Sequence, residues 1–253
     1  GMIVRRLNNE GRNASLSFWG GYGDSKSRNF SRSDIQYFQR TDGNNRQFSN
    51  QYTNSPSKNW NYGARLSYSE PIVKNLHAQF NYQYDYSYSS NARSLYQLDS
   101  LQGWRDMYNP ALGTYPTDAD SLRYALNVRN SQYATYKNYT HRIGVGLRYN
   151  TKTIQGHAAI EMQPQRTKLS YQKDKLDTVV TRNVFNLSPN IRFRYKISET
   201  SQLDFRYRGS SSQPSMTDLL DVTDDSDPLY ISRGNPGLKP SWSNNLSLFY
   251  NNY

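Results

Sequence analysis

Long stretches of this chain alternate apolar and polar residues with a period of two. From Leu76 to Tyr88 every even position is apolar, while the odd positions carry His, Gln, Asn, Asp or Ser. Successive side chains of a β-strand point to opposite faces, so this spacing predicts a strand with one apolar and one polar face. The alternation recurs at 62–68, 139–149, 187–195 and 203–207, and more weakly at 14–22, 158–162 and 246–250. We therefore expect about eight strands.

The connections between these stretches are short and long in turn. Short ones lie at 70–75, 150–153 and 198–201, and long polar ones at 89–132, 166–177 and 209–241. Transmembrane β-barrels have short periplasmic turns and longer extracellular loops, and a tilted strand of about ten residues crosses a bilayer. Only a closed sheet pairs every backbone group in lipid. The pattern predicts an all-β fold: residues 1–253 form one antiparallel transmembrane β-barrel segment of long strands.

Composition argues against disorder and leaves one soluble alternative. A mean hydropathy of −0.96 and a net charge of +11 are typical of disordered chains, but this one is 14% aromatic and has 23 tyrosines. No apolar run approaches the roughly 18 residues of a membrane helix. The polar positions carry Arg, Lys, Gln and Asn, which do not fill a dry core. A soluble antiparallel sandwich also alternates, so it stays open as the alternative fold.

Three stretches carry a family resemblance. Near the C-terminal end, Asp225-Ser226-Asp227-Pro228-Leu229 is followed by Gly234-Asn235-Pro236-Gly237-Leu238-Lys239-Pro240 and a strand. Residues 8–13 and the segment Tyr68-Ser69-Glu70-Pro71-Ile72 look like periplasmic turns entering or leaving strands. These residues resemble the C-terminal barrel of TonB-dependent receptor-like outer-membrane proteins of the Bacteroidetes type.

The resemblance implies an outer-membrane barrel of a Gram-negative cell that serves nutrient uptake. Its partners would be outer-membrane lipid, the remaining barrel strands, a plug and, through that plug, the TonB complex. Eight strands are too few for a plugged barrel of roughly 22 strands, and neither a plug, a TonB-contacting segment nor a signal peptide is apparent, so we expect a barrel fragment. Gly1 before Met2 is typical of a residue left by cloning. The alternatives are a structural or adhesive outer-membrane barrel and a soluble β-sandwich binding module, each using its long loops.

Charged residues recur at the polar positions, which would line the lumen of such a barrel. They offer either a surface that prefers anionic solutes or plug groups, or cross-strand salt bridges in a hydrated lumen, and we favour the salt bridges. The acidic residues Glu161 and Asp204 and the basic Lys196 share these positions. The candidate lumen-facing residues are Arg65, Asp85, Arg142, Arg148, Arg192, Arg194, Arg206 and Arg208.

The first long loop contains the candidate recognition residues. Trp104, Tyr108, Tyr115 and Tyr124 fit either binding of a glycan or protein or packing within the loop. In the same loop, Asp118 and Asp120 are placed to cap a short helical pattern at 121–128.

No pattern in the sequence indicates catalysis, a cofactor or a metal. The chain lacks cysteine, a P-loop, an H-E-x-x-H motif and a G-x-S-x-G motif. His77, His141 and His157 are isolated, and the aspartates at 218, 221, 224, 225 and 227 lack the calcium-loop spacing. Tyr and Arg fall on opposite strand faces, which separates the two ingredients of a single-strand nucleic-acid site. We expect no enzyme, no cofactor, no metal and no nucleic-acid partner.

Overall fold

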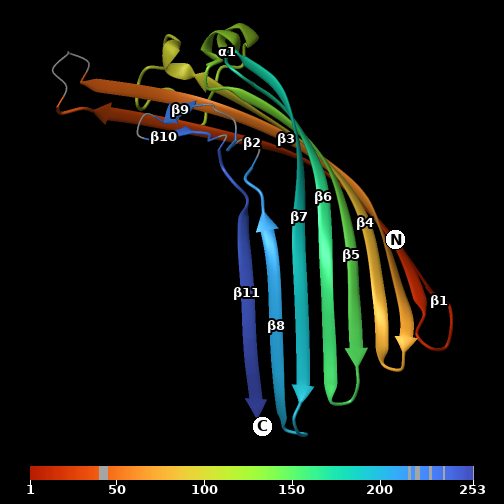
Figure 1. Ribbon diagram of the computed structural model, residues 1–253. Coiled ribbons are helices and arrows are strands. Elements are labelled where there is room, and N and C mark those ends of the chain that lie inside the picture. Colours follow the sequence, from red (N-terminus) through yellow and green to blue (C-terminus); the bar gives the residue numbers. More distant parts are fainter. Residues whose placement is uncertain (40–44, 216–217, 220–222, 228–229, 236, 253) are drawn as a thin grey trace.

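The computed structural model shows a nine-stranded antiparallel sheet in which successive strands are neighbours, in the order β1-β2-β3-β4-β5-β6-β7-β8-β11 (Figure 1). It describes the chain except residues 40–44, 216–217, 220–222, 228–229, 236 and 253. A separate two-stranded sheet pairs β9 with β10. The elements are β1 (Met2–Arg6), β2 (Asn13–Gln36), β3 (Arg46–Val73), β4 (Leu76–Gln97), η1 (Leu98–Ser100), α1 (Ala119–Ala125), β5 (Gln132–Asn150), β6 (Ile154–Lys173), β7 (Leu176–Lys196), β8 (Ser201–Ser212), β9 (Thr223–Asp227), β10 (Tyr230–Arg233) and β11 (Ser241–Asn252).

The predicted all-β antiparallel fold is confirmed, with nine strands in the main sheet in place of about eight. The predicted short turns are also confirmed, at residues 74–75, 151–153 and 197–200. These turns lie together at one end of the sheet, beside the C-terminus, while α1 and the β9–β10 hairpin lie at the other, distal end (Figure 1). This arrangement agrees with the short-turn and long-loop ends that the sequence predicts.

Two of the predicted long loops are wrong in extent. Residues 166–177 form a tight hairpin, in which β6 runs to Lys173, β7 starts at Leu176, and Asp174 has a positive φ of 51°. The loop predicted from residue 89 begins only after Gln97, where β4 ends and the short η1 follows. In residues 167–173 backbone pairing continues but burial alternates with the opposite parity, with Thr167, Leu169, Tyr171 and Lys173 buried, so the apolar pattern of the spanning part does not extend into this segment. The predicted helix is found one turn earlier than expected, at Ala119–Ala125.

Strand length separates a spanning part from a distal extension. β8 and β11 have 12 residues each, whereas β2 has 24 and β3 has 28. Twelve residues extend about 40 Å, which crosses the apolar part of a bilayer when tilted. The longer strands continue beyond that length, and the distal parts of β2 and β3 bend away from the direction of the turn-end parts (Figure 1).

The main sheet has an apolar face without protein cover. In β2–β3 the register is continuous, so even positions such as Phe18 and Ala64 stand opposite one another, and Leu66 pairs with Tyr82 in β4. Side chains of this apolar face remain accessible, as at Leu147 (49% exposed) and Leu246 (68% exposed). Within the described ranges the buried hydrophobic residues are few: Tyr52, Tyr86, Leu95, Leu98, Ala125, Ala134, Leu169 and Tyr171. An apolar surface of this extent fits burial in lipid far better than exposure to water.

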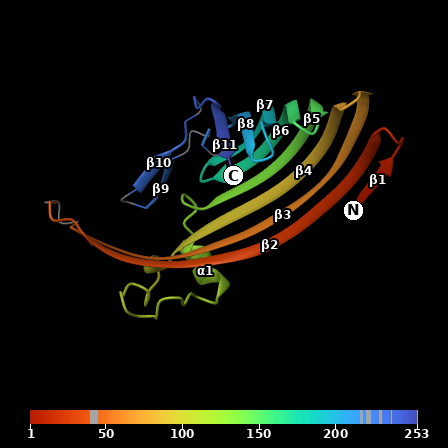
Figure 2. The same cartoon turned by 90° about the horizontal axis from the view of Figure 1, so that it is seen from below.

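The sheet is curved and open. No pairing joins β1 to β11 among the residues that the structure describes, so these two strands form its edges. The view from below shows the strands following one curved layer between these edges (Figure 2). In the same described part of the chain, no helix is long and apolar enough to cross a membrane.

Candidate functional site: the polar face of the sheet

The register of the strands places the eight candidate lumen residues on one face, opposite the apolar face. Arg65 pairs with Gln83, and Gln83 pairs with Arg142, which puts these three side chains in one row across β3, β4 and β5. A second row, nearer the turns, contains Arg148, His157 and Arg192 of β5, β6 and β7 and ends at Arg206 of β8. We call this surface the polar face; it carries Arg65, Asp85, Arg142, Arg148, Arg192, Arg194, Arg206 and Arg208.

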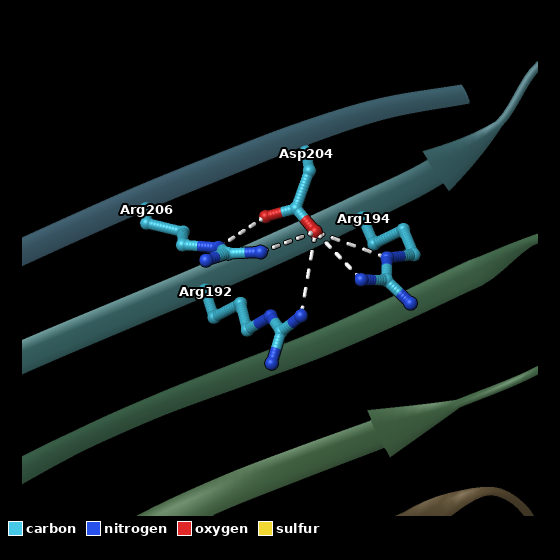
Figure 3. Close-up of polar contacts among 4 residues, drawn as sticks. All are labelled: Arg192, Arg194, Asp204 and Arg206. Carbon is cyan, nitrogen blue, oxygen red and sulfur yellow. Dashed lines mark hydrogen bonds and ion pairs between the residues drawn. The ribbon is translucent and has the colours of Figure 1, made fainter. Parts of the chain in front are cut away.

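One carboxylate organises the arginines at the C-terminal side of the polar face. The Asp204 side chain is 4% exposed and accepts hydrogen bonds from Arg192, Arg194 and Arg206 (Figure 3). The shortest are from Arg206 Nε at 2.7 Å and Arg194 Nη2 at 2.8 Å, while Arg192 Nη2 lies at 3.4 Å. Three guanidinium groups share one carboxylate, so the cluster keeps an excess of positive charge. This cluster contains the kind of cross-strand salt bridge that the sequence favoured, although the charges do not balance.

A polar cavity of ≈ 300 Å³ opens beside this cluster. Its charged and imidazole side chains are Arg148, His157, Arg192 and Arg194, and amide side chains come from Gln79, Asn150 and Gln155. The cavity therefore collects side chains from four neighbouring strands, β4 to β7.

A second polar hollow of ≈ 380 Å³ adjoins the first and shares Gln79 and His157 with it. Gly144, Gly146 and Ala159 also line this second hollow. At Gly146 an added Cβ would come within 2.8 Å of the Ala159 Cβ, so this position has no room for a larger residue. Small residues at adjacent positions of β5 and β6 thus make the polar face concave here.

Trp19 is a residue of the polar face that the sequence reading did not single out. Its indole lies over Gly63, where an added Cβ would approach Trp19 Cζ2 to 2.5 Å and Asp85 Oδ1 to 2.8 Å. Gly63 is therefore required for the close approach of the ring to the strand. The sequence does indicate that Trp19 lies on this face, because it occupies an odd position in a strand whose even positions are apolar.

The loop between β4 and β5 packs against the distal continuation of the apolar face. Tyr115 stacks on Tyr52 at 4.6 Å between ring centroids, and Tyr52 stacks on Phe30 at 4.9 Å. Trp104 packs against the same cluster. Tyr108 and Tyr124 are 83% and 74% exposed. The four candidate recognition residues thus divide into a packed pair and an exposed pair.

Hydrogen bonds from β2 and β3 fix this loop to the rest of the protein, and Asn50 of β3 donates to the Trp104 carbonyl oxygen at 3.1 Å. Arg32 of β2 donates through Nη1 to the Met107 carbonyl oxygen at 3.1 Å, and its other terminal nitrogen donates to the Pro110 carbonyl oxygen. The Asp118 carboxylate accepts a hydrogen bond from the Ser121 backbone nitrogen at 2.7 Å and caps α1, as the sequence predicts. Hydrogen bonds from Ser121 hold the pKa of the Asp118 carboxyl below its usual value.

The residues considered for a metal site are dispersed. His77 and His157 lie on the polar face, whereas His141 is on the apolar face and shares a hydrogen bond with the Tyr82 hydroxyl at 2.8 Å. Across the described residues, no three His, Asp or Glu side chains are grouped as metal ligands. Of the five loop aspartates, Asp221 lies outside the described residues, as do the side chains of the aspartates at 224, 225 and 227.

Comparison with known proteins gives a family for the whole fold. No curated protein matches the chain. The sequence profile of the outer membrane protein beta-barrel family matches residues 5–253, which is nearly the full length. The two-faced sheet with short turns at one end agrees with this match. The chain therefore belongs to the outer membrane protein beta-barrel family, and its location is the outer membrane.

Proposed function

We propose that this chain forms part of the wall of a TonB-dependent receptor-like transporter for nutrient uptake. The observation that carries the proposal is the polar face, where two adjoining hollows of ≈ 300 and 380 Å³ lie among uncompensated arginines. Such a surface suits a hydrated passage or the seat of a plug and does not suit a packed core. The resemblance of the 225–240 segment to Bacteroidetes-type receptors supports the same function.

In this function the chain acts passively. Its apolar face holds the wall in lipid, and its polar face offers hydrogen bonds and positive charge to a passing solute or to the plug. The remaining barrel strands, the plug and the TonB complex would be the partners that close the passage and supply energy. No catalytic step is assigned to the chain.

Uptake measurements on the full-length protein test this proposal. Cells with and without the gene, each in TonB-positive and TonB-negative backgrounds, are given labelled maltoheptaose as a neutral probe and labelled citrate as an anionic one. We expect uptake of at least one probe to need both the gene and TonB. Gene-dependent uptake that is equal in the TonB-positive and TonB-negative backgrounds, or no gene-dependent uptake of either probe, would count against the proposal.

An adhesive or structural barrel is the second candidate, and the distal extension favours it. Strands of 19 to 28 residues continue past the length that a membrane requires, and they carry a loop with Tyr108 and Tyr124 exposed. Attachment of cells to glycan-coated surfaces tests this candidate: under it, the double change Tyr108→Ala and Tyr124→Ala reduces attachment and leaves uptake unchanged. The soluble sandwich loses its support because the family is an outer-membrane one.

A further inference from the structure

The guanidinium groups around the 300 Å³ cavity have more donors than the protein uses. Among the described residues Arg148 has no hydrogen-bond or ion-pair partner. Arg192 is half exposed, and its contact with Asp204 is a single one at 3.4 Å. Both side chains line the same cavity, from the neighbouring strands on either side of β6.

We infer that this cavity is a binding site for the oxyanion group of a small solute, a phosphate or a carboxylate. Arg148 and Arg192 supply paired guanidinium donors, the group best matched to two oxygens of such an anion. Gln79 and Gln155 line the same cavity and offer neutral amide donors. The inference rests on the proposed transport function and names the chemical class of its solute.

The distribution of acidic residues makes an external anion the fitting ligand. Among the residues that the structure describes, no Asp or Glu lines the cavity. Asp204, next to it, already accepts hydrogen bonds from three arginines, and Glu161 lines the adjoining hollow instead. The described part of the chain therefore provides no carboxylate that would neutralise Arg148, and an incoming oxyanion would do so.

The strand framework keeps these donors in place without a ligand. Arg148 and His157 are directly cross-strand, as are His157 and Arg192, so backbone hydrogen bonds on both sides of β6 fix the spacing of the two arginines. A preformed arrangement of this kind reduces the ordering cost of binding. Because both arginines are in contact with water, we expect binding to weaken as salt increases.

Titration calorimetry with inorganic phosphate and with succinate tests the site on the full chain in detergent micelles. We expect saturable binding that becomes at least about ten-fold weaker in the double variant Arg148→Gln and Arg192→Gln. Arg208→Gln is the control, because it removes one positive charge from the same face, as each single change does, but at a residue that does not line the cavity. The relative affinities of phosphate and succinate distinguish the two sources of the oxyanion. Absence of binding by both anions, or an equal loss in Arg208→Gln, would overturn the inference.

A chemical protection experiment on the unaltered protein does not depend on the folding of any variant. Phenylglyoxal modifies accessible guanidinium groups, and mass spectrometry reports the modification of each arginine. We expect phosphate to protect Arg148 and Arg192 several-fold more than the exposed Arg5; equal protection of all three contradicts a defined site. These two assays measure anion binding and not transport. If neither shows binding while uptake still depends on TonB, the oxyanion site is rejected and the transport function is retained.

Discussion

At the scale of single residues, the polar face depends on one carboxylate. Asp204→Asn keeps the size of the side chain and removes the charge that three guanidinium groups share. We expect the free energy of unfolding to fall by about 1–3 kcal/mol, since hydrogen bonds to a charged group are lost while partial solvation of the arginines limits the cost. Urea denaturation in detergent micelles measures this change. Asp85→Asn is the control, because Asp85 accepts one hydrogen bond from Gln83 at 2.7 Å; an equal loss in both variants would contradict the special role of Asp204.

The approach of Trp19 to Gly63 gives a second prediction for a single residue. In Gly63→Ala, the new Cβ would stand 2.5 Å from Trp19 Cζ2, so the indole must move off the strand into water. We expect a red shift of Trp19 fluorescence, measured in a background where Trp60, Trp104 and Trp242 are replaced by Phe. Gly144→Ala is the comparison, because its Cβ meets nothing nearer than 3.6 Å, and it is expected to leave the spectrum unchanged. A spectrum unaffected by Gly63→Ala would show that the ring does not occupy this place.

At the scale of elements, the loop between β4 and β5 is held by a side chain of a different strand. Arg32→Gln removes the donors that reach the Met107 and Pro110 carbonyl oxygens. We expect chymotrypsin to cleave beside the exposed Tyr108 several-fold faster, because local opening of the loop then costs less. Lys26→Gln changes a charge on the same strand and should leave the rate unaltered. Equal rates for the native protein and Arg32→Gln would mean that aromatic packing and the Asn50 hydrogen bond are enough to fix the loop.

The distal hairpin of β2 and β3 is predicted to depend on pH. Arg46 Nε donates to the Asp34 carboxylate at 2.8 Å, and this hydrogen bond holds the pKa of Asp34 below its usual value. A carboxyl whose pKa is lower in the folded state stabilises that state above its unfolded pKa and ceases to do so as pH falls through the folded pKa. Amide protection factors of residues 31–36, corrected for intrinsic exchange, should therefore fall under acid conditions. In Asp34→Asn this fall should be absent; a fall of the same size would assign it to another group.

The elements also show how far the sequence determines the structure. The alternation at 76–88 predicted β4 because lipid on one side and water on the other impose opposite preferences on its faces. The distal part of β6 reverses this rule: Leu169 and Tyr171 are buried at polar-face positions, where they pack with Ala134 of β5. In the distal extension, the protected side is therefore the polar-face side in β5 and β6, whereas in β2 and β3 the loop covers the apolar-face side at Phe30 and Tyr52. A prediction that assigns the apolar positions of every strand to the lipid side misses this reversal, and it therefore placed a loop at residues 166–177.

The sequence predicted which residues lie on the polar face, but not which of them lie close together. Parity alone put Arg148 and Arg192 on one face, because strand pairing preserves the alternation. That they share a cavity depends on the register across β6, and the same holds for the three arginines around Asp204. Register results from pairing over whole strands, which single positions in a sequence do not reveal.

At the scale of the whole molecule, each face of the sheet has a suitable solvent in a membrane, but its two edges do not. The apolar face is accommodated by lipid and the polar face by water, but the edge strands β1 and β11 present backbone groups that neither solvent satisfies inside a membrane. We therefore expect the edges of the open sheet seen in Figure 2 to be paired in the membrane, with further strands of a barrel, with another copy of the chain or with each other. The polar face becomes a lumen only when these edges are joined.

Amide hydrogen exchange of the isolated chain in detergent micelles tests the open edges. Residues 155–162 of β6 pair with β5 on one side and β7 on the other, whereas β11 is paired only with β8 among the described strands. We expect this part of β6 to be strongly protected, and alternate amides along β11 to exchange at least about ten-fold faster, because they have no backbone acceptor. β8 serves as the internal control, since it has the same length of 12 residues as β11 but two neighbours. The contrary result is a compact monomer by light scattering in which β11 is as protected as β8. That result would show that the sheet closes on itself and that the polar face encloses a lumen within this chain alone.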